Sequence, residues 1–197
     1  MITTTEDTHS LIIQHAEALF HRYGFGKTTV ADIARECGMS PANVYRFFPA
    51  KAAIVAAIAR IWLGELNAHG RAIAREDGPA PERLRRYVLD THRIIRDRYV
   101  SDPKVHEMTV KVIEESWEVV REFLAGQVEI VAEILADGVR RGEFRIDDIP
   151  ATAQVVRATL PKFHHPMLVA QCIDEPLAEQ AERVVDLLLW GLAPRHR

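Results

Sequence analysis

The sequence of 197 residues contains only two cysteines, Cys37 and Cys172, and they lie far apart in the chain. This usage favours a cytoplasmic protein with reduced thiols over a disulfide-stabilised secreted domain. No apolar run reaches the about 18 residues that a membrane-spanning helix needs. The acidic, polar N-terminus also lacks the features of a signal peptide. We therefore expect a cytoplasmic protein that has no membrane partner.

Catalytic and metal-binding motifs are missing as well. The chain has no Gly-x-Ser-x-Gly, His-Glu-x-x-His or Gly-x-Gly-x-x-Gly motif. Residues 26–28 imitate the end of a phosphate-binding loop, but His21 stands where that loop needs a glycine. No two histidines are three or four residues apart, which is the spacing of metal ligands on a helix. We expect no enzyme activity, no cofactor and no metal, with a metal role for His164 and His165 left as an alternative.

Positive charge is scarce too. The chain holds 25 Lys and Arg against 28 Asp and Glu, for a formal net charge of −3. Proteins that bind nucleic acids usually carry a basic patch. Any such patch must therefore be local here, and Lys27, Arg46 and Lys51 are the cations that can form it. Modest non-specific affinity for DNA is the expected consequence.

Residues 28–51 contain a pattern of two short helices joined by a tight turn. Thr29 can cap the first helix, and Asp32 follows three residues later, as in a capping box. Gly38 stands where a chain that leaves a helix often needs positive φ. Ser40 is a good N-cap, and Pro41 suits the first position of a helix. The second helix is therefore predicted to begin after only a few residues.

The second helix has a surface that suits the major groove of DNA. Val44, Phe47 and Phe48 are spaced so that they should all face inward. Arginine can pair with guanine, asparagine with adenine, and small or aromatic groups can meet a thymine methyl. An ordinary surface helix is the alternative, but the helix-turn-helix pattern favours the groove. The outward side chains are those of Ala42, Asn43, Tyr45 and Arg46.

Several short motifs between residues 9 and 55 occur together. They are Tyr23-Gly24-Phe25, Thr28-Thr29-Val30, Asp32-Ile33-Ala34, Gly38-Met39-Ser40, Val44-Tyr45, Phe48 and Lys51. In this combination the segment resembles the DNA-binding domain of the TetR (tetracycline-repressor-like) family of regulators. The resemblance implies phosphate contacts at Thr29 and Lys51, and a contact of Tyr45 with the DNA backbone or a base methyl.

Two positions depart from the family pattern. Phe47 replaces a tyrosine or histidine that often reaches phosphate, and Asn43 replaces a threonine or small residue, which points to a different base preference. The predicted DNA-binding residues are Thr28, Thr29, Ser40, Pro41, Ala42, Asn43, Tyr45, Arg46 and Lys51.

Helices alone are predicted for the rest of the chain. A long helix covers residues 51–75, with Ile54, Ile58, Ile61 and Trp62 facing inward. Further helices cover about 81–99 and 103–115. Later in the chain, the prolines at 161 and 166 are predicted to interrupt the helical structure where they stand. We predict an all-α fold of about nine helices. It comprises an N-terminal three-helix helix-turn-helix DNA-binding domain, residues 1–50, and a C-terminal helical ligand-binding and dimerisation bundle, residues 51–197.

The last helix is apolar nearly all round over residues 184–192. Such a helix should be buried twice, against its own domain and against a partner, unless Trp190 and its neighbours form only monomer core. Two recognition helices on a two-fold axis read half-sites about 34–36 Å apart. The TetR resemblance also implies that the last two helices build a homodimer. The predicted interface residues are Val155, Ala158, Thr159, Val185, Leu188, Leu189 and Leu192.

The C-terminal half resembles the family in layout, and family members often hold a small molecule between these helices. A helical bundle with interior polar groups is also a plausible pocket on physical grounds. The candidate ligand-binding residues are Trp62, Leu66, His92, Met108, Trp117 and Phe163.

The expected function is that of a homodimeric repressor which binds double-stranded DNA at a pseudo-palindromic operator. A small-molecule effector would release it by shifting the helix of residues 51–75. The alternatives are a ligand-independent or activating DNA-binding factor, and a metal-responsive repressor.

Overall fold

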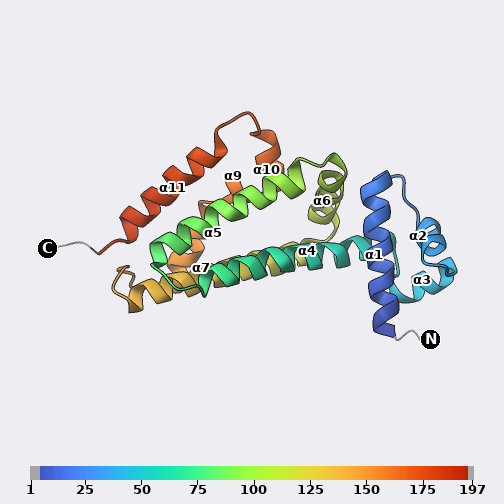
Figure 1. Ribbon diagram of the computed structural model, residues 1–197, viewed down its shortest axis with the longest axis horizontal. Coiled ribbons are helices and arrows are strands. Elements are labelled where there is room, and N and C mark those ends of the chain that lie inside the picture. The colour runs from blue at the N-terminus through green and yellow to red at the C-terminus, as the bar shows by residue number, and fades with distance from the viewer. Residues whose placement is uncertain (1–4, 195–197) are drawn as a thin grey trace. The chain divides into compact units, whose positions relative to one another are not determined.

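A computed structural model describes residues 5–194, which form eleven α-helices and one π-helical segment (Figure 1). No strand occurs between residues 5 and 194, and the predicted all-α class is confirmed. Internal contacts divide the chain into two compact units, each of which combines two segments. Unit 1 comprises Met1–Trp62 and Asp102–Val120, and unit 2 comprises Leu63–Ser101 and Arg121–Arg197. The division into domains at residue 50 stays a prediction.

Unit 1 contains three N-terminal helices and two further helical segments that pack on them. They are α1 (Thr5–Tyr23), α2 (Val30–Glu36), α3 (Pro41–Phe47), the start of α4 (Lys51–Ala74) and α6 (Pro103–Glu115). Ile12, Phe20 and Ile33 are buried at its centre. In the first turn of helix α1, acidic Glu6 and Asp7 complement the positive end of the helix dipole.

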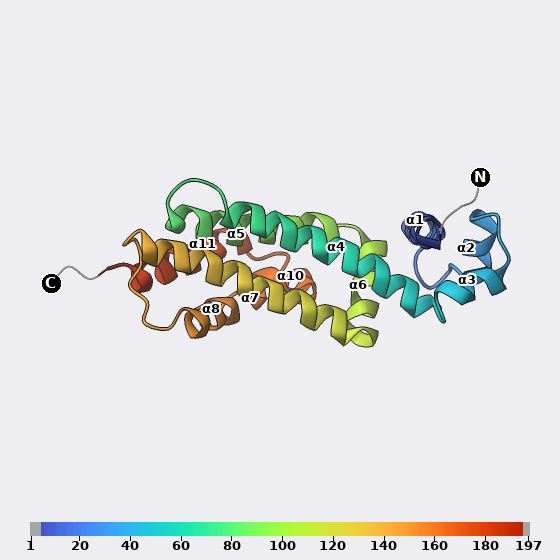
Figure 2. The same cartoon turned by 90° about the horizontal axis from the view of Figure 1, so that it is seen from below.

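Unit 2 is a bundle of helices. It contains the rest of α4, α5 (Ala80–Ile94), a π-helix (Ile95–Val100), most of α7 (Trp117–Arg140), α8 (Ile149–Ala158), α9 (Pro161–His164), α10 (Pro166–Gln171) and α11 (Leu177–Leu192). Within this unit α4 lies beside α7, and α11 packs along α5 (Figures 1 and 2). Leu84, Val131, Ile134 and Val185 lie in its core.

Prolines and hydrogen bonds explain two breaks in the bundle. Pro161 and Pro166 each open a short helix, so the predicted interruption is confirmed. The helix predicted over 81–99 instead changes from α to π geometry at Ile95. The backbone N–H and the hydroxyl of Ser101 both donate to the carbonyl of Arg96, at 3.1 and 2.9 Å, and this five-residue closure ends the π segment.

Helix α4 buries a narrower stripe than the sequence predicted. Ile54, Ile58 and Trp62 are buried at four-residue intervals, but Ile61 is 45% exposed. The prediction that Ile61 faces inward is therefore wrong, because its position lies beside the stripe that the four-residue interval defines. Among residues 5–194 no single helix is long and apolar enough to cross a membrane; α3 and α4 meet that test only as a pair, bent by 53°.

One glycine of α7 makes room for the packing at the end of the bundle. A Cβ atom at Gly138 would overlap the ring of Phe144 and lie 2.9 Å from the Cβ of Ala80. Phe144 and Ala80 are themselves buried. Gly64 in α4 differs, because a Cβ there would meet no atom within 4 Å.

This contrast predicts opposite effects of the same substitution. Gly138→Ala should lower the free energy of unfolding by about 1–3 kcal/mol, because it overpacks a filled site. Gly64→Ala should instead raise it by about 0.5–1 kcal/mol, since alanine is the better helix former. Urea unfolding followed by circular dichroism measures both. Equal effects in the two variants would contradict the packing described for Gly138.

Candidate nucleic-acid interface

The first helix of the motif begins with the predicted capping box. The Asp32 backbone N–H donates to Oγ1 of Thr29 at 3.1 Å, and the Thr29 backbone N–H donates to Oδ2 of Asp32 at 3.0 Å. Hydrogen bonds from Thr29, and a further one from Arg35 at 2.6 Å, lower the pKa of Asp32 to about 2. The Asp32 carboxylate is therefore charged at neutral pH and holds the start of α2 in place.

The turn into the second helix follows the sequence prediction closely. Gly38 has φ of 66°, in the left-handed region that favours glycine. Ser40 caps α3 by accepting a hydrogen bond from the backbone N–H of Asn43 at 3.3 Å, and Pro41 is the first helical residue. The junction thus fixes the direction in which α3 leaves α2.

The two faces of α3 differ in character. Val44 and the following Phe48 are buried, whereas Tyr45 is 51% exposed and Arg46 is also exposed. Asn43 is half-buried, with its Nδ2 atom 3.7 Å from the sulfur of Met39. The exposed face also carries Ser40, Pro41 and Ala42. An outward face of small, phenolic and cationic side chains can contact base edges and phosphates.

Phe47 departs from its predicted position. It is only half-buried, because Val44 and Phe48 already fill the inner side of α3. The guanidinium of Arg46 lies 5.0 Å from the centroid of the Phe47 ring. This contact orients the cation at the edge of the outward face.

Thr28 is not a surface residue. Its side chain is 2% exposed, and its hydroxyl donates to the carbonyl of Gly24 at 2.9 Å, with a longer contact to that of Leu19 at 3.4 Å. The expectation that this side chain contacts DNA is therefore corrected. Thr28 instead closes the end of α1, and Thr29 beside it remains exposed.

Lys51 also differs from the free cation that the resemblance implied. Its Nζ atom donates to the carbonyls of Phe25 at 2.8 Å and Thr28 at 3.0 Å, and lies 3.9 Å from the centroid of the Phe25 ring. Burial lowers the pKa of Lys51, and the nearby charge of Glu107 opposes that change. Lys51 thus joins the start of α4 to the turn that precedes α2, and Lys27 is the exposed cation of this turn.

Helix α6 holds the same turn from its other side. Glu107 accepts a hydrogen bond from the backbone N–H of Gly26 at 3.2 Å. Lys104 donates to the carbonyl of Arg22 at 2.7 Å, and His21 lies 3.7 Å from the carboxylate of Asp102. These contacts join residues about 80 positions apart, and no local sequence signal announces them.

The six candidate ligand-binding residues are not brought together. Trp62 and Met108 belong to the core of unit 1, where the indole N–H of Trp62 donates to Glu17 at 2.7 Å. Trp117 is 60% exposed at the start of α7, so its predicted place in a pocket is corrected. The buried candidates of unit 2 are Leu66, His92 and Phe163.

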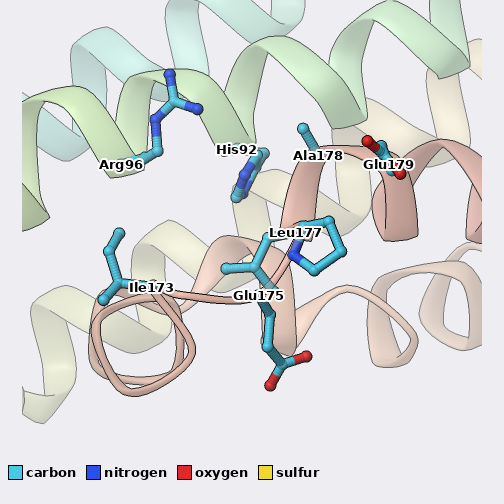
Figure 3. Close-up of a pocket in the computed structure, with 8 residues that line it drawn as sticks. His92, Arg96, Ile173, Glu175, Leu177, Ala178 and Glu179 are labelled. Atoms are coloured by element: carbon cyan, nitrogen blue, oxygen red, sulfur yellow. The ribbon is translucent and has the colours of Figure 1, made fainter.

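His92 is the only one of these candidates that lines the pocket in Figure 3. Its Nδ1 atom lies 3.0 Å from the carbonyl of Phe163, which orients the ring. The pocket has a volume of about 180 Å³, below the roughly 300–1,000 Å³ typical of ligand sites. It therefore suits a small group rather than a large molecule. The lining residues are His92, Arg96, Ile173, Glu175, Pro176, Leu177, Ala178 and Glu179.

The predicted interface residues divide into two sets. On α8, Val155 is 62% exposed, and Ala158 and Thr159 are also exposed. On α11, Val185 and Leu192 are buried in the core of their own chain, so their predicted role in a dimer is corrected. Leu188 and Leu189 are half-buried. The exposed apolar side chains of α11 are Leu187 and Trp190, at 69% and 78%.

The described part of the chain contains no group of three or more histidine, cysteine, aspartate or glutamate side chains that could hold a metal ion. His164 and His165 instead lie at the end of α9 and in the link to α10.

Two family models match the chain. Residues 12–58 match the model described as bacterial regulatory proteins, tetR family, and residues 80–185 match the tetracyclin repressor-like C-terminal domain. The second match alone covers more than half of the chain. No curated protein sequence matches the chain.

Solved structures share the fold at low sequence identity. A TetR-family transcriptional regulator from Pectobacterium atrosepticum has a TM-score of 0.75 and 19% identity, over 98% of this chain and 97% of its own. SmeT, the repressor of the Stenotrophomonas maltophilia multidrug efflux pump SmeDEF, has a TM-score of 0.67 and 20% identity, over 94% and 90%. The Bacillus subtilis regulator FadR, solved with stearoyl-CoA, has a TM-score of 0.64 and 20% identity, over 93% and 98%.

The contacts of Lys51 generate a prediction about stability. Lys51→Met should lower the free energy of unfolding by about 1–3 kcal/mol, because the carbonyls of Phe25 and Thr28 lose a charged donor. Lys27→Met removes the same charge from an exposed position and should change it by less than about 0.5 kcal/mol. Urea unfolding measures both variants. Similar stability of the two would show that Lys51 does not hold this turn.

Proposed function

Since the chain belongs to the tetR family of bacterial regulatory proteins, which bind DNA, we propose that it is a homodimeric transcriptional repressor released from its operator by a small molecule. The outward face of α3 is the observation that carries the DNA-binding part of this proposal. The exposed apolar side chains of α8 and α11 support the homodimer.

The proposed contacts with DNA separate into two kinds. Arg46, Asn43 and Tyr45 read base edges from α3, because their side chains offer hydrogen bonds and an apolar ring to the groove. Exposed Thr29, Ser40 and Lys27 lie on the adjoining turns and would contact phosphate. Pro41 and Ala42 have small side chains at the N-terminal end of α3, so that the helix can approach the base pairs. Lys51 and Thr28 act indirectly, by holding the turn from which Lys27 and Thr29 project.

The proposed dimer interface is formed by one face of α8 and one of α11. Leu187 and Trp190 are large apolar side chains that the monomer leaves exposed, and Val155 adds a third on α8. Residues of this kind mark protein interfaces when they form a shared patch. A two-fold axis between two copies would place two α3 helices on one face of the duplex, and they would read a pseudo-palindrome.

Release by a ligand requires a link between effector binding and the DNA-reading helices. Helix α4 begins at Lys51, beside the helix-turn-helix, and ends at Ala74 in unit 2. A ligand that favours one position of α4 would change the spacing of two α3 helices. The difference in its affinity for the two states must reach a few kcal/mol to move most of the population. The acyl-CoA bound by FadR and the regulation of an efflux pump by SmeT support a small organic effector.

Substitutions on α3 test the reading face. Arg46→Ala and Asn43→Ala should each weaken operator binding by about 1–3 kcal/mol and relax specificity at one base of each half-site. The control is Arg145→Ala, which removes an exposed arginine from unit 2. Binding to an operator selected from genomic DNA, measured by fluorescence anisotropy, reports all three. Unchanged affinity in both α3 variants would refute the assigned face.

A single charge on α11 tests the interface. Trp190→Asp should convert the dimer to monomers, because it places an unpaired charge in an apolar contact. Trp117→Asp is a matched control, since Trp117 is also more than half exposed but lies outside α8 and α11. Light scattering after size exclusion gives the mass of each variant. A Trp190→Asp protein with the mass of the wild-type dimer would place the interface elsewhere.

A further inference from the structure

The interior of unit 2 contains polar atoms that lack partners. The hydroxyl of Tyr87, the Nδ1 atoms of His164 and His165, and the Nε atom of Arg83 are all buried, and no described residue forms a hydrogen bond with them. Tyr87 is only 2% exposed and His164 only 5%. A buried polar group without a hydrogen bond lowers the stability of the folded state. Several such groups in one region need an explanation beyond packing.

Tyr87 and His164 lie against each other in the bundle. Their rings are edge to face, with centroids 6.1 Å apart. A Cβ atom at Gly70 would come within 2.9 Å of the Tyr87 ring, so the phenol lies tightly between α4 and its own helix α5. The phenol ring is therefore closely packed against the backbone of α4 at Gly70.

Hydrogen bonding fixes the tautomer of His164. Its Nε2 atom lies 3.0 Å from the carbonyl of Val88, and a carbonyl can only accept. Nε2 therefore carries the hydrogen, and Nδ1 is a bare acceptor. Burial lowers the pKa of His164 to about 4, so this neutral form persists at neutral pH. The cluster thus contains an acceptor at His164 and a donor at the hydroxyl of Tyr87.

Arg157 adds a cation to the cluster. It is half-buried on α8, and its Nε donates to the side-chain oxygen of buried Gln127 at 2.9 Å. Burial raises the pKa of Tyr87 well above its usual value, and the charge of Arg157 opposes that rise. The same charge contributes to the lowered pKa values of His164 and His165, for which burial is the larger cause.

Arg83, the buried arginine of the bundle, shows what half-buried Arg157 lacks. Arg83 forms an ion pair with the carboxylate of Asp137. Between residues 5 and 194, no carboxylate forms an ion pair with Arg157, whose Nε donates to the neutral side chain of Gln127. Burying a charge is unfavourable unless the charge is paired. The cluster of Tyr87, Gln127, Arg157, His164 and His165 is therefore short of one negative charge.

We propose that this cluster is the effector site, and that it binds a small organic carboxylate with a hydrogen-bond donor next to its carboxyl group. The inference rests on the proposed function and names its ligand class. The carboxylate pairs with Arg157 and accepts from the hydroxyl of Tyr87, and the adjacent donor bonds to Nδ1 of His164. A single guanidinium balances one negative charge, which favours a carboxylate over a dianionic phosphate.

Binding is tested on the full-length protein without DNA. The probes are 2-hydroxybenzoate, benzoate, benzamide and phenyl phosphate, measured by calorimetry at about pH 7. We expect 2-hydroxybenzoate to bind, benzoate to bind more weakly, and neutral benzamide and phenyl phosphate to bind at least about tenfold more weakly than 2-hydroxybenzoate. Arg157→Gln should abolish binding of 2-hydroxybenzoate, and the exposed control Arg145→Gln should not.

A second measurement does not depend on the choice of probe. In the absence of ligand, Tyr87→Phe should raise the melting temperature by about 2–4 °C, because it removes a buried hydroxyl that has no hydrogen-bond partner among the described residues. The control Tyr23→Phe alters an exposed phenol and should change it little. A lower melting temperature for Tyr87→Phe would overturn the proposal, since it would assign this hydroxyl to the structural framework.

The two measurements also separate this inference from the proposed function. A probe that binds wild type but not Arg157→Gln, yet leaves the operator complex intact, would support the site and contradict ligand-controlled release. Equal binding of 2-hydroxybenzoate by wild type and Arg157→Gln would overturn the site. If another small molecule releases the Arg157→Gln variant from the operator, the proposed function is supported and the effector binds at a different site.

Discussion

The position of α3 depends on how two turns satisfy their backbone groups. The first motif helix starts at a reciprocal pair of hydrogen bonds between Thr29 and Asp32, and α3 starts at the cap provided by Ser40. Lys51 then ties the turn before α2 to the start of α4 through two carbonyls. A short helix cannot hold its own direction by propensity. Tyr45 and Arg46 therefore face outward because the helix caps and the partly buried ammonium of Lys51 fix the direction of α3. The helix propensity of α3 contributes less.

Sequence predicted the elements whose signals are local. Gly38, Ser40 and Pro41 determine their turn by their own backbone preferences, and Pro161 and Pro166 break helices for the same reason. The contacts that the sequence did not predict join residues that lie far apart in the chain. Lys51 has the position of a phosphate contact in the family pattern, but the carbonyls of a turn about 25 residues earlier occupy it. Glu107 on α6 belongs to the same turn, and nothing within its own helix indicates this.

Helix α11 shows a different limit of predicting burial from the pattern of apolar residues. A helix that is apolar nearly all round does not reveal which side faces its own chain. In the structure Val185 and Leu192 are buried, whereas Leu187 and Trp190 are exposed. Leu188 and Leu189, which are half-buried, lie at the border between the two faces. The expectation of double burial is consistent with this division, because a monomer that satisfied the whole helix would not leave its tryptophan at the surface.

Two arginines of unit 2, buried Arg83 and half-buried Arg157, differ in how their charges are balanced. Arg83 lies beside Asp137, which also pairs with Arg140 and Arg141, so its charge is balanced within the fold. Within residues 5–194 Arg157 has no carboxylate partner and donates to the neutral oxygen of Gln127. A core selected for stability alone would replace such a group with an apolar side chain, since a buried charge without a counter-charge is unfavourable. The proposed ligand supplies the missing charge, and an effector of that kind would join α5, α8 and α9 through a single contact set.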